Sequence, residues 1–348
     1  MHGSTRLSSH LAVVQDVDVR HSTTTAFVLC LLTAVVAGSC ASDNDSSTPP
    51  SAGEPTVIAE GFDQPTQIVD GPDGLLIVAQ LAGDESAATG EIVALDPTTG
   101  AREVVLDGLD KPTGVLWRPG ELYVMVRRGL LRAPWPGNGA AGPVEVLLAD
   151  LPFNGRSEGT LTGLADGRIV YETTGTLVAG DAETGSGALW AFDPADGTSA
   201  LLASGLKNAY GHALLPDGRI ITTEIGDNGD ERPLEELNVI SLAEVADFGW
   251  PDCPGEQSCA GVQGPAALFD PTATPTGVAV TGDDVVVSLF VTGELMRVSL
   301  AGWVAGDQPR STTMVVSGLK GPHTVLVRPD GALWISEHLT GRILSITL

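Results

Sequence analysis

Residues 71–80 read GPDGLLIVAQ, a turn rich in glycine and proline followed by an aliphatic run of strand length. The same turn-and-strand pattern returns five more times along the chain. The later copies are RPGELYVMV (118–126), LADGRIVYETTG (164–175), LPDGRIITTEIG (215–226), TGDDVVVSLF (281–290) and RPDGALWISEH (328–338). Self-similarity of this kind predicts a repeat architecture rather than a collection of unrelated strands.

The spacing of the copies indicates the size of the repeated unit. Successive turns lie 46, 47, 51, 65 and 48 residues apart, which is the length of a four-stranded propeller blade. The first unit divides into four strand-length pieces, PTQIVDGP, GLLIVAQ, GEIVALDP and REVVLDGL. The chain has 43 glycines and 23 prolines among 348 residues, enough turn formers for many short strands. The sequence therefore predicts an all-β fold, a six-bladed β-propeller with four-stranded blades.

The two ends of the repeat region do not match. PTVIAEGF (55–62) resembles the fourth strand of a unit and precedes the first blade, whereas the last unit stops after the third-strand sequence GRILSITL (341–348). We expect the N-terminal strand to complete the last blade, which removes the open edges of the ring. The propeller then extends from residue 56 to 348. A pair of stacked sandwiches is the alternative, but it does not explain the offset terminal strand.

The N-terminal region has the features of an export signal. Residues 26–37, AFVLCLLTAVVA, form an apolar run too short to span a bilayer but suited to a signal peptide. Small residues and Cys40 follow, and then a polar stretch, as in a bacterial lipoprotein signal. We expect a signal peptide over 1–39, lipidation of Cys40 and a disordered tether over 40–55. The exported protein would then lie at the cell surface or in the periplasm, held to the membrane only by this lipid; ordinary secretion is the alternative.

Charge and cysteine content limit the partners and the compartment. The formal net charge is −26, so the chain repels nucleic acid, and no run of Lys or Arg offsets this repulsion. Cys253 and Cys259 are the two cysteines that follow Cys40. In an oxidising compartment they are expected to form a disulfide bond.

The predicted propeller brings distant polar residues together. The loops before the first strand and after the second strand of every blade meet at one end of the central tunnel, which we call the mouth. The polar residues expected there are Thr66, Thr113, Arg156, Glu158, Lys207, Asn208, Tyr210, Thr276 and His323 before first strands, and Gln80, Arg127, Glu172, Glu224, Asp227, Glu337 and His338 after second strands.

One long segment resembles a known family. Residues 205–253, GLKNAYGHALLPDGRIITTEIGDNGDERPLEELNVISLAEVADFGWPDC, contain in order an Asn-containing entry loop, a PDG turn, a TEIG strand end, an ELN strand and an FGWP turn. This order resembles the central signature of the soluble quinoprotein glucose/sorbosone dehydrogenases. Weaker resemblance continues over the rest of the predicted ring.

The resemblance implies oxidation of a sugar or related alcohol by pyrroloquinoline quinone (PQQ) held above the tunnel with Ca²⁺. The family's catalytic histidine falls at Arg156, and arginine cannot act as a base. His212 or Glu158 is therefore the expected substitute catalytic base. The residues implied to bind the cofactor are Arg156, Lys207, Asn208, Tyr210 and His323. Lys207 stands where the family has arginine, His323 where it has another arginine, and Val291 where it has a quinone-binding lysine.

The metal ion has its own implied site. In the family, backbone carbonyls at the positions of Gly226 and Asp227 face the Ca²⁺, and Glu224 adds a carboxylate. A solvated acidic loop is the alternative interpretation of this segment.

Two other functions stay open at this point. A non-catalytic propeller could bind a carbohydrate or a protein through the same mouth. A metal-dependent lactonase-like propeller would need several carboxylate or Asn ligands at the tunnel, for which Glu224, Asn208 and Glu337 are candidates.

Overall fold

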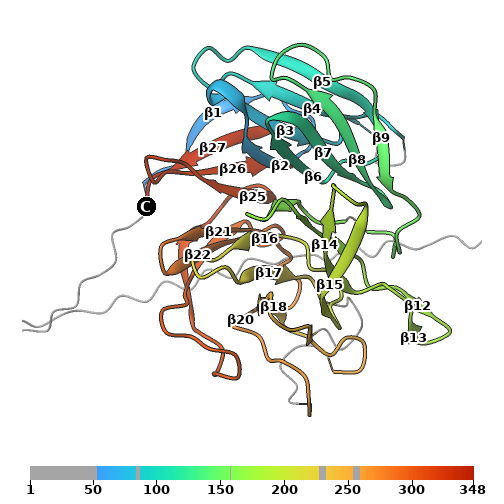
Figure 1. The fold of residues 1–348 in the computed structure, drawn as a ribbon. Coiled ribbons are helices and arrows are strands. Elements are labelled where there is room, and N and C mark those ends of the chain that lie inside the picture. Colours follow the sequence, from blue (N-terminus) through green and yellow to red (C-terminus); the bar gives the residue numbers. More distant parts are fainter. Residues whose placement is uncertain (1–52, 84–86, 157, 227–232, 254–258) are drawn as a thin grey trace, which may run out of the picture. The chain divides into compact units, whose positions relative to one another are not determined.

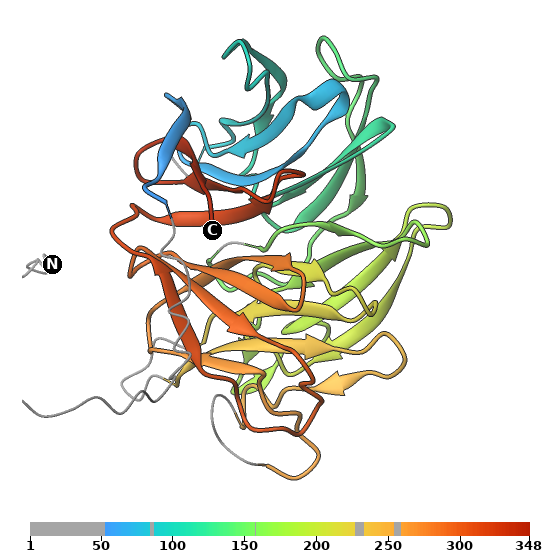
Figure 2. The same cartoon turned by 90° about the vertical axis from the view of Figure 1, so that its left-hand side faces the viewer.

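The computed structural model describes residues 53–83, 87–156, 158–226, 233–253 and 259–348. The expected signal peptide and Cys40 lie outside the described residues, and so does Asp227. In the described ranges no helix is long and apolar enough to cross a membrane. The described chain is built almost entirely of strands, which form six antiparallel sheets, each of four core strands (Figures 1 and 2).

The first three blades follow the predicted units. Blade 1 contains β2 (Pro65–Asp70), β3 (Leu76–Gln80), β4 (Gly90–Leu95) and β5 (Arg102–Leu109), with the short 3₁₀ turn η1 (Pro72–Gly74) between β2 and β3. Blade 2 contains β6 (Gly114–Arg118), β7 (Gly120–Val126), β8 (Gly129–Trp135) and β9 (Glu145–Leu148). Blade 3 contains β10 (Thr162–Gly163), β11 (Ile169–Thr173), β14 (Ala188–Asp193) and β15 (Thr198–Ser204).

The last three blades continue the same order. Blade 4 contains β16 (His212–Leu214), β17 (Ile220–Glu224), β18 (Glu235–Ile240) and β20 (Ala267–Phe269). Blade 5 contains β21 (Pro275–Thr281), β22 (Asp284–Leu289), β23 (Glu294–Ser299) and β24 (Thr312–Val316). Blade 6 contains β25 (Pro322–Val327), β26 (Leu333–Glu337), β27 (Arg342–Ile346) and β1 (Thr56–Glu60).

The ring closes as the sequence predicts. β1 pairs antiparallel with β27, with Thr56 opposite Ser345 and Glu60 opposite Arg342. Figure 1 shows this closure as the blue first strand beside the red last one. The offset N-terminal strand is thereby confirmed as the fourth strand of blade 6.

The hydrophobic core is divided among the interfaces between neighbouring blades. Six clusters of buried side chains are present, and each joins two consecutive blades. The packing of β3 explains why its sequence is continuously apolar. Leu76 and Val78 pack toward blade 6, whereas Ile77 and Ala79 pack toward blade 2. Because successive side chains of a strand point to opposite faces, a strand between two neighbouring sheets needs apolar residues at nearly every position.

Two additions explain the irregular spacings. β12 (Leu177–Val178) and β13 (Asp181–Ala182) form a small hairpin between the second and third strands of blade 3. β19 (Ala246–Asp247) lies in the segment between β18 and β20 and pairs parallel to β15, on the outer edge of blade 3. The longest interval between turns, 65 residues, therefore includes a segment that leaves blade 4 to extend its neighbour.

Candidate functional site

A pocket of about 170 Å³ lies at the mouth, where the innermost strands of the blades begin. We call it the mouth pocket. Its lining residues are Thr66, Leu81, Thr113, Arg156, Asn208, Tyr210, Ile225, Thr274, Thr276, Phe290, His323 and His338. The structure therefore brings Arg156, Asn208, Tyr210 and His323 together, as the propeller arrangement predicts.

A recurring Pro-Thr dipeptide contains three of the four threonines that line the pocket. Thr66 follows Pro65, Thr113 follows Pro112, and Thr276 follows Pro275. Each hydroxyl donates to a backbone carbonyl of the next blade, as in the 2.9 Å bond from Thr66 to the Pro112 oxygen. These threonines join adjacent blades around the pocket, so their hydroxyl hydrogens are engaged by the fold.

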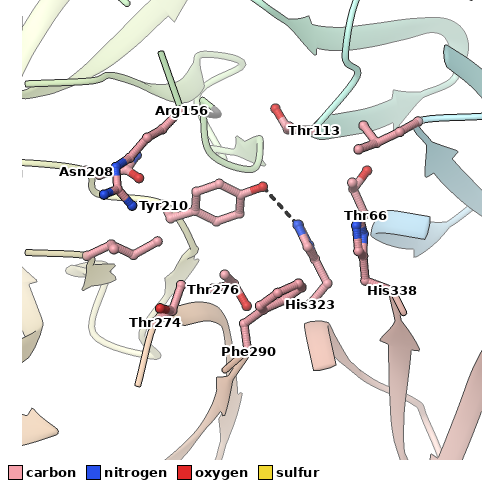
Figure 3. Close-up of a pocket in the computed structure, with 12 residues that line it drawn as sticks. Thr66, Thr113, Arg156, Asn208, Tyr210, Thr274, Thr276, Phe290, His323 and His338 are labelled. Carbon is pink, nitrogen blue, oxygen red and sulfur yellow. Dashed lines mark hydrogen bonds between the residues drawn. The ribbon is translucent and has the colours of Figure 1, made fainter. Parts of the chain in front are cut away.

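An aromatic and imidazole cluster forms one side of the mouth pocket. The Tyr210 hydroxyl lies 2.9 Å from His323 Nε2, across 113 residues of sequence. The rings of His323 and His338 are stacked with centroids 5.6 Å apart, and Phe290 meets both rings edge-on. Arg156 and Asn208 lie on the other side of Tyr210 from these histidines (Figure 3). A cation and an amide thus lie opposite an aromatic and imidazole wall.

The hydrogen bonds define the protonation of the two histidines. His338 Nδ1 lies 3.2 Å from the Pro65 carbonyl oxygen, which can only accept, so Nδ1 carries a hydrogen. Burial, and next the neighbouring His338, hold the pKa of His323 well below its ordinary value. His323 is therefore neutral near pH 7.

The remaining basic residues differ in their distance from the pocket. Arg156 is exposed, its backbone N–H donates to Asn154 Oδ1 at 3.0 Å, and its charge acts on Glu235 of β18. Lys207 does not line the mouth pocket. Its ammonium donates to the Gly175 carbonyl at 3.1 Å and lies 4.8 Å from the centre of the Trp250 ring.

The predicted residues at the ends of second strands brace the loops. In three blades the side chain accepts a hydrogen bond from a backbone N–H that lies 17 residues earlier, in the loop before the first strand. The acceptor and donor residues are Gln80 and Asp63, Glu224 and Lys207, and Glu337 and Lys320. These polar side chains therefore hold the loops of the mouth in place from outside the pocket, and none of the three acceptors lines the pocket.

The three braces differ in their cross-strand partners. Gln80 donates to Glu91 on the next strand, at 2.7 Å, and Glu337 pairs with Arg342. At the equivalent place in blade 4, Glu224 faces another carboxyl, Glu236. Burial, and next the charge of Glu236, raise the pKa of Glu224 well above its usual range. The Glu224 carboxyl is therefore held toward its neutral form, and its Oε2 has no hydrogen-bond partner among the described residues.

Glu158 and Glu172 are buried behind Arg156 and Asn208. Glu158 accepts a 2.9 Å hydrogen bond from the Arg128 backbone, and its Oε2 has no partner among the described residues. Burial raises the pKa of Glu158 to about 7 and that of Glu172 well above its usual range. Asn208 donates its amide to Glu172. Glu158, one of the two candidate bases, does not line the mouth pocket.

The other candidate base, His212, lines a different cavity. It is the first residue of β16, two positions after Tyr210, and lies farther along the tunnel. Among the lining residues of the mouth pocket the imidazoles are instead those of His323 and His338.

The predicted metal ligands are only partly described. The Gly226 N–H donates to Glu235 at 2.8 Å, Glu224 braces Lys207, and Asp227 lies outside the described residues. In the part of the chain that the structure describes, no three His, Cys, Asp or Glu side chains are grouped to hold a metal ion.

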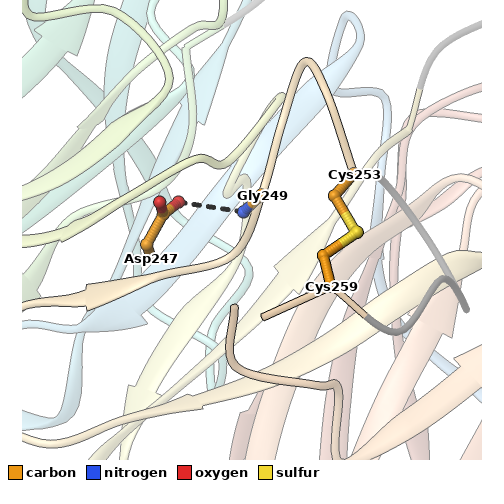
Figure 4. The surroundings of a disulfide bond; sticks show 4 residues. All are labelled: Asp247, Gly249, Cys253 and Cys259. Atoms are coloured by element: carbon orange, nitrogen blue, oxygen red, sulfur yellow. Dashed lines mark hydrogen bonds between the residues drawn. A yellow bond between two sulfur atoms is a disulfide. The ribbon is translucent and has the colours of Figure 1, made fainter. Parts of the chain in front are cut away.

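The predicted disulfide is present. Cys253 and Cys259 are bonded beside the FGWP turn, where the Gly249 N–H donates to Asp247 at 3.0 Å (Figure 4). Trp250 fills the space over Gly187, where an added Cβ would lie 2.9 Å from its ring. The turn therefore packs the segment between β18 and β20 against blade 3.

Sequence reasoning missed several lining residues, although the repeat contains the signal for them. Leu81, Ile225 and Phe290 were not expected at the mouth, and each directly follows the second strand of its blade, as does His338, which was expected there. Aligning the units on their strand ends rather than on polar residues would have identified this position, which lines the pocket in blades 1, 4, 5 and 6.

A known family model matches part of the chain. Residues 188–345 match the model of the glucose / sorbosone dehydrogenase family. The match confirms the resemblance seen in residues 205–253. No curated protein sequence matches the chain.

Three solved structures illustrate the shared fold. The PQQ-bound aldose sugar dehydrogenase of Streptomyces coelicolor is 21% identical with a TM-score of 0.70, over 86% of this chain and 99% of that one. The PQQ domain of Coprinopsis cinerea pyranose dehydrogenase is 16% identical, with a TM-score of 0.66 over 84% and 95%. A calcium structure of a Trichoderma reesei family AA12 carbohydrate-active enzyme is 16% identical, with a TM-score of 0.69 over 88% and 100%. At these identities the likeness shows the propeller fold.

Proposed function

We propose that this protein is an oxidoreductase that transfers hydride from a sugar or related alcohol to PQQ at the mouth pocket. The observation that carries the proposal is the composition of the pocket lining. The chain has 44 acidic residues, yet among the described residues no Asp or Glu lines the mouth pocket. One arginine, one amide and two imidazoles do. Such a set of donors favours a ligand rich in hydrogen-bond acceptors and negative charge.

The donor set fits PQQ, a planar molecule with carboxylate groups. Arg156 and Asn208 would hold the carboxylates, and the rings of Tyr210 and Phe290 offer apolar surface to a flat ring system. Bound PQQ supplies the acceptor for the hydride. The related structures carry PQQ or calcium in their descriptions, which supports the same cofactors here.

A residue of the mouth pocket can accept the proton of the substrate hydroxyl. We assign the general base to His338, because its Nδ1–H is engaged by Pro65, which makes Nε2 the basic atom of the neutral ring. His323 and Tyr210 form a neutral hydrogen-bonded pair beside it, suited to orienting a sugar hydroxyl. Glu158 and His212 are not assigned this role, since neither lines the mouth pocket.

Export of the protein is part of the proposal. The apolar run before Cys40 supports a signal peptide, and lipidation of Cys40 would anchor the propeller to the membrane surface. Mass spectrometry of the mature N-terminus tests this, because a lipoprotein begins with an acylated Cys40.

The activity is tested by reconstituting the purified protein with PQQ and Ca²⁺ and measuring dye reduction with a panel of aldoses. His338→Asn keeps a donor for the Pro65 carbonyl and removes the base, so we expect kcat to fall by about 100-fold or more while quinone binding is unchanged. Arg156→Ala should instead weaken quinone binding, followed by absorbance. His212→Leu serves as the control and should leave both unchanged.

The outcome that contradicts the proposal is equally specific. If no quinone binds at saturating PQQ and Ca²⁺, the dehydrogenase assignment fails and a non-catalytic carbohydrate- or protein-binding propeller is supported. The lactonase-like alternative is not favoured, because Glu337 is engaged by Arg342, Thr340 and the Lys320 backbone.

A further inference from the structure

A recess of about 220 Å³ lies between blades 4 and 5, outside the mouth pocket. We call it the interblade recess. Blade 4 and the loop that follows it contribute Phe269 and Asp270, and blade 5 contributes Leu289, Glu294 and Met296. None of its lining residues lines the mouth pocket. The recess is therefore a separate feature from the site of the proposed oxidation.

The register of blade 5 shows which way Glu294 points. In the pairing of β22 with β23, Leu289 lies opposite Glu294 and Val287 lies opposite Met296. Cross-strand partners share one face of a sheet. Leu289 and Val287 both belong to the apolar cluster between blades 4 and 5. Glu294 therefore extends from the face of blade 5 that meets blade 4, as Met296 does.

Apolar side chains form the inner wall of the recess. Phe269, Ala273 and Leu289 line it and are each at most 5% exposed. Met296 is partly buried and packs against the same cluster. Because a methionine side chain is unbranched and has three rotatable bonds, it adapts to ligands of different shape. A molecule that enters the recess thus meets aliphatic and aromatic surface.

The charged residues of the lining are both acidic. Asp270 is exposed and Glu294 is partly exposed, so both carboxylates are accessible from solvent. Among the described residues, neither side chain has a hydrogen-bond or ion-pair partner. No Lys, Arg or His is among the lining residues that the structure describes. The recess thus combines an apolar wall with two unneutralised negative charges.

From this arrangement we infer that the interblade recess binds a small aliphatic amine in its ammonium form, with the alkyl chain on the apolar wall and the charge at Asp270 and Glu294. Charge complementarity selects the cation, since carboxylates form their strongest hydrogen bonds with charged donors. The wall selects an alkyl body, because removing apolar surface from water is favourable. This site does not depend on the proposed oxidation at the mouth.

The test compares hexylammonium with hexanol, which has the same alkyl chain and no charge. The protein is labelled with ¹³C at its methionine methyl groups, because Met296 lines the recess whereas Met125 is buried between blades 2 and 3. We expect hexylammonium to shift the Met296 methyl resonance, to leave that of Met125 in place and to bind about tenfold more tightly than hexanol. Butylammonium should bind about fivefold more weakly than hexylammonium, since it buries two fewer methylenes.

Two matched variants separate binding in the recess from the general attraction of a cation to an acidic protein. The chain has a formal net charge of −26, and each variant removes one negative charge from it. Glu294→Gln does so in the recess and keeps the size of the side chain. Glu244→Gln does so at an exposed loop position outside the recess. The first should weaken hexylammonium binding about three- to fivefold, and the second should leave it unchanged.

Any one of three results would overturn the inference. They are equal binding of hexylammonium and hexanol to the native protein, equal affinity for hexylammonium in the two variants, and a Met296 resonance that does not move. Because the comparison of the two compounds uses the native chain, it stays decisive even if a variant does not fold. None of these measurements needs bound PQQ, so failure of the proposed oxidation would leave them unaffected.

Discussion

Replacing Glu158 with glutamine should remove a defined pH dependence from the stability of the propeller. Glu158 is completely buried, and its Oε1 accepts the Arg128 backbone N–H. Burial raises its pKa to about 7, from 4.5 for an unperturbed glutamate. Because the folded-state pKa is above the unfolded one, the folded protein holds the proton more tightly. The stabilisation is complete below pH 4.5 and is lost as the pH rises through 7.

The size of the effect follows from the same two values. Each pKa unit corresponds to about 1.4 kcal/mol, so a shift from 4.5 to about 7 makes the folding free energy roughly 3 kcal/mol less favourable at pH 8 than at pH 4.5. Glutamine keeps the Oε1 acceptor for Arg128 and cannot ionise. At pH 4.5 the free energy of unfolding of Glu158→Gln should therefore equal that of the native protein or be smaller. By pH 8 it should have risen by about 3 kcal/mol relative to the native value.

Urea unfolding of both proteins at several pH values between 4.5 and 8 measures this difference directly. Comparing the two proteins at each pH cancels most of the contribution of the other buried carboxyls. Glu244→Gln, at an exposed loop position, is the control and should show a stability difference that does not change with pH. A difference between native protein and Glu158→Gln that is flat across this range would refute the reasoning, because the carboxyl would then be equally acidic in both states.

Two further changes test how the mouth is held together. Gly159→Ala should destabilise the protein by about 3 kcal/mol, because the added Cβ would lie 2.1 Å from the Tyr210 carbonyl oxygen. Gly264→Ala is the control: its Cβ would meet open space, so the free energy of unfolding should change by less than about 0.5 kcal/mol. Arg342→Ala leaves the buried Glu337 carboxylate without its cation and should lower the free energy of unfolding, measured in a thermal or urea melt, by about 2 kcal/mol. Arg342→Lys should recover part of this loss. No loss in the alanine variant would show that the ion pair does not stabilise the protein.

Much of the fold was predictable from local patterns. The repeated turn and strand, the spacing of the units and the misplaced fourth strand at residues 55–62 were sufficient to predict six blades and their closure. The convergence of Arg156, Asn208, Tyr210 and His323 followed from that ring, because every blade presents the same two loops at the same end. The Cys253–Cys259 bond was likewise predictable, from the oxidising compartment expected of the chain.

The chemical state of individual side chains was not predictable in this way. His212 and Tyr210 are two residues apart in the chain, yet the tertiary structure places one in the lining of a second cavity and the other in the lining of the mouth pocket. Glu224 and Glu337 occupy equivalent places in their blades, but one faces a glutamate and the other an arginine.

The sequence by itself determined the architecture, since hydrophobic pattern and turn chemistry act over a few neighbouring residues and repeat with the unit. Only the tertiary structure decided which imidazoles line the mouth pocket and which buried polar atoms have no partner among the described residues. Those properties depend on burial and on contacts between residues far apart in the chain, such as Tyr210 and His323, 113 positions from each other.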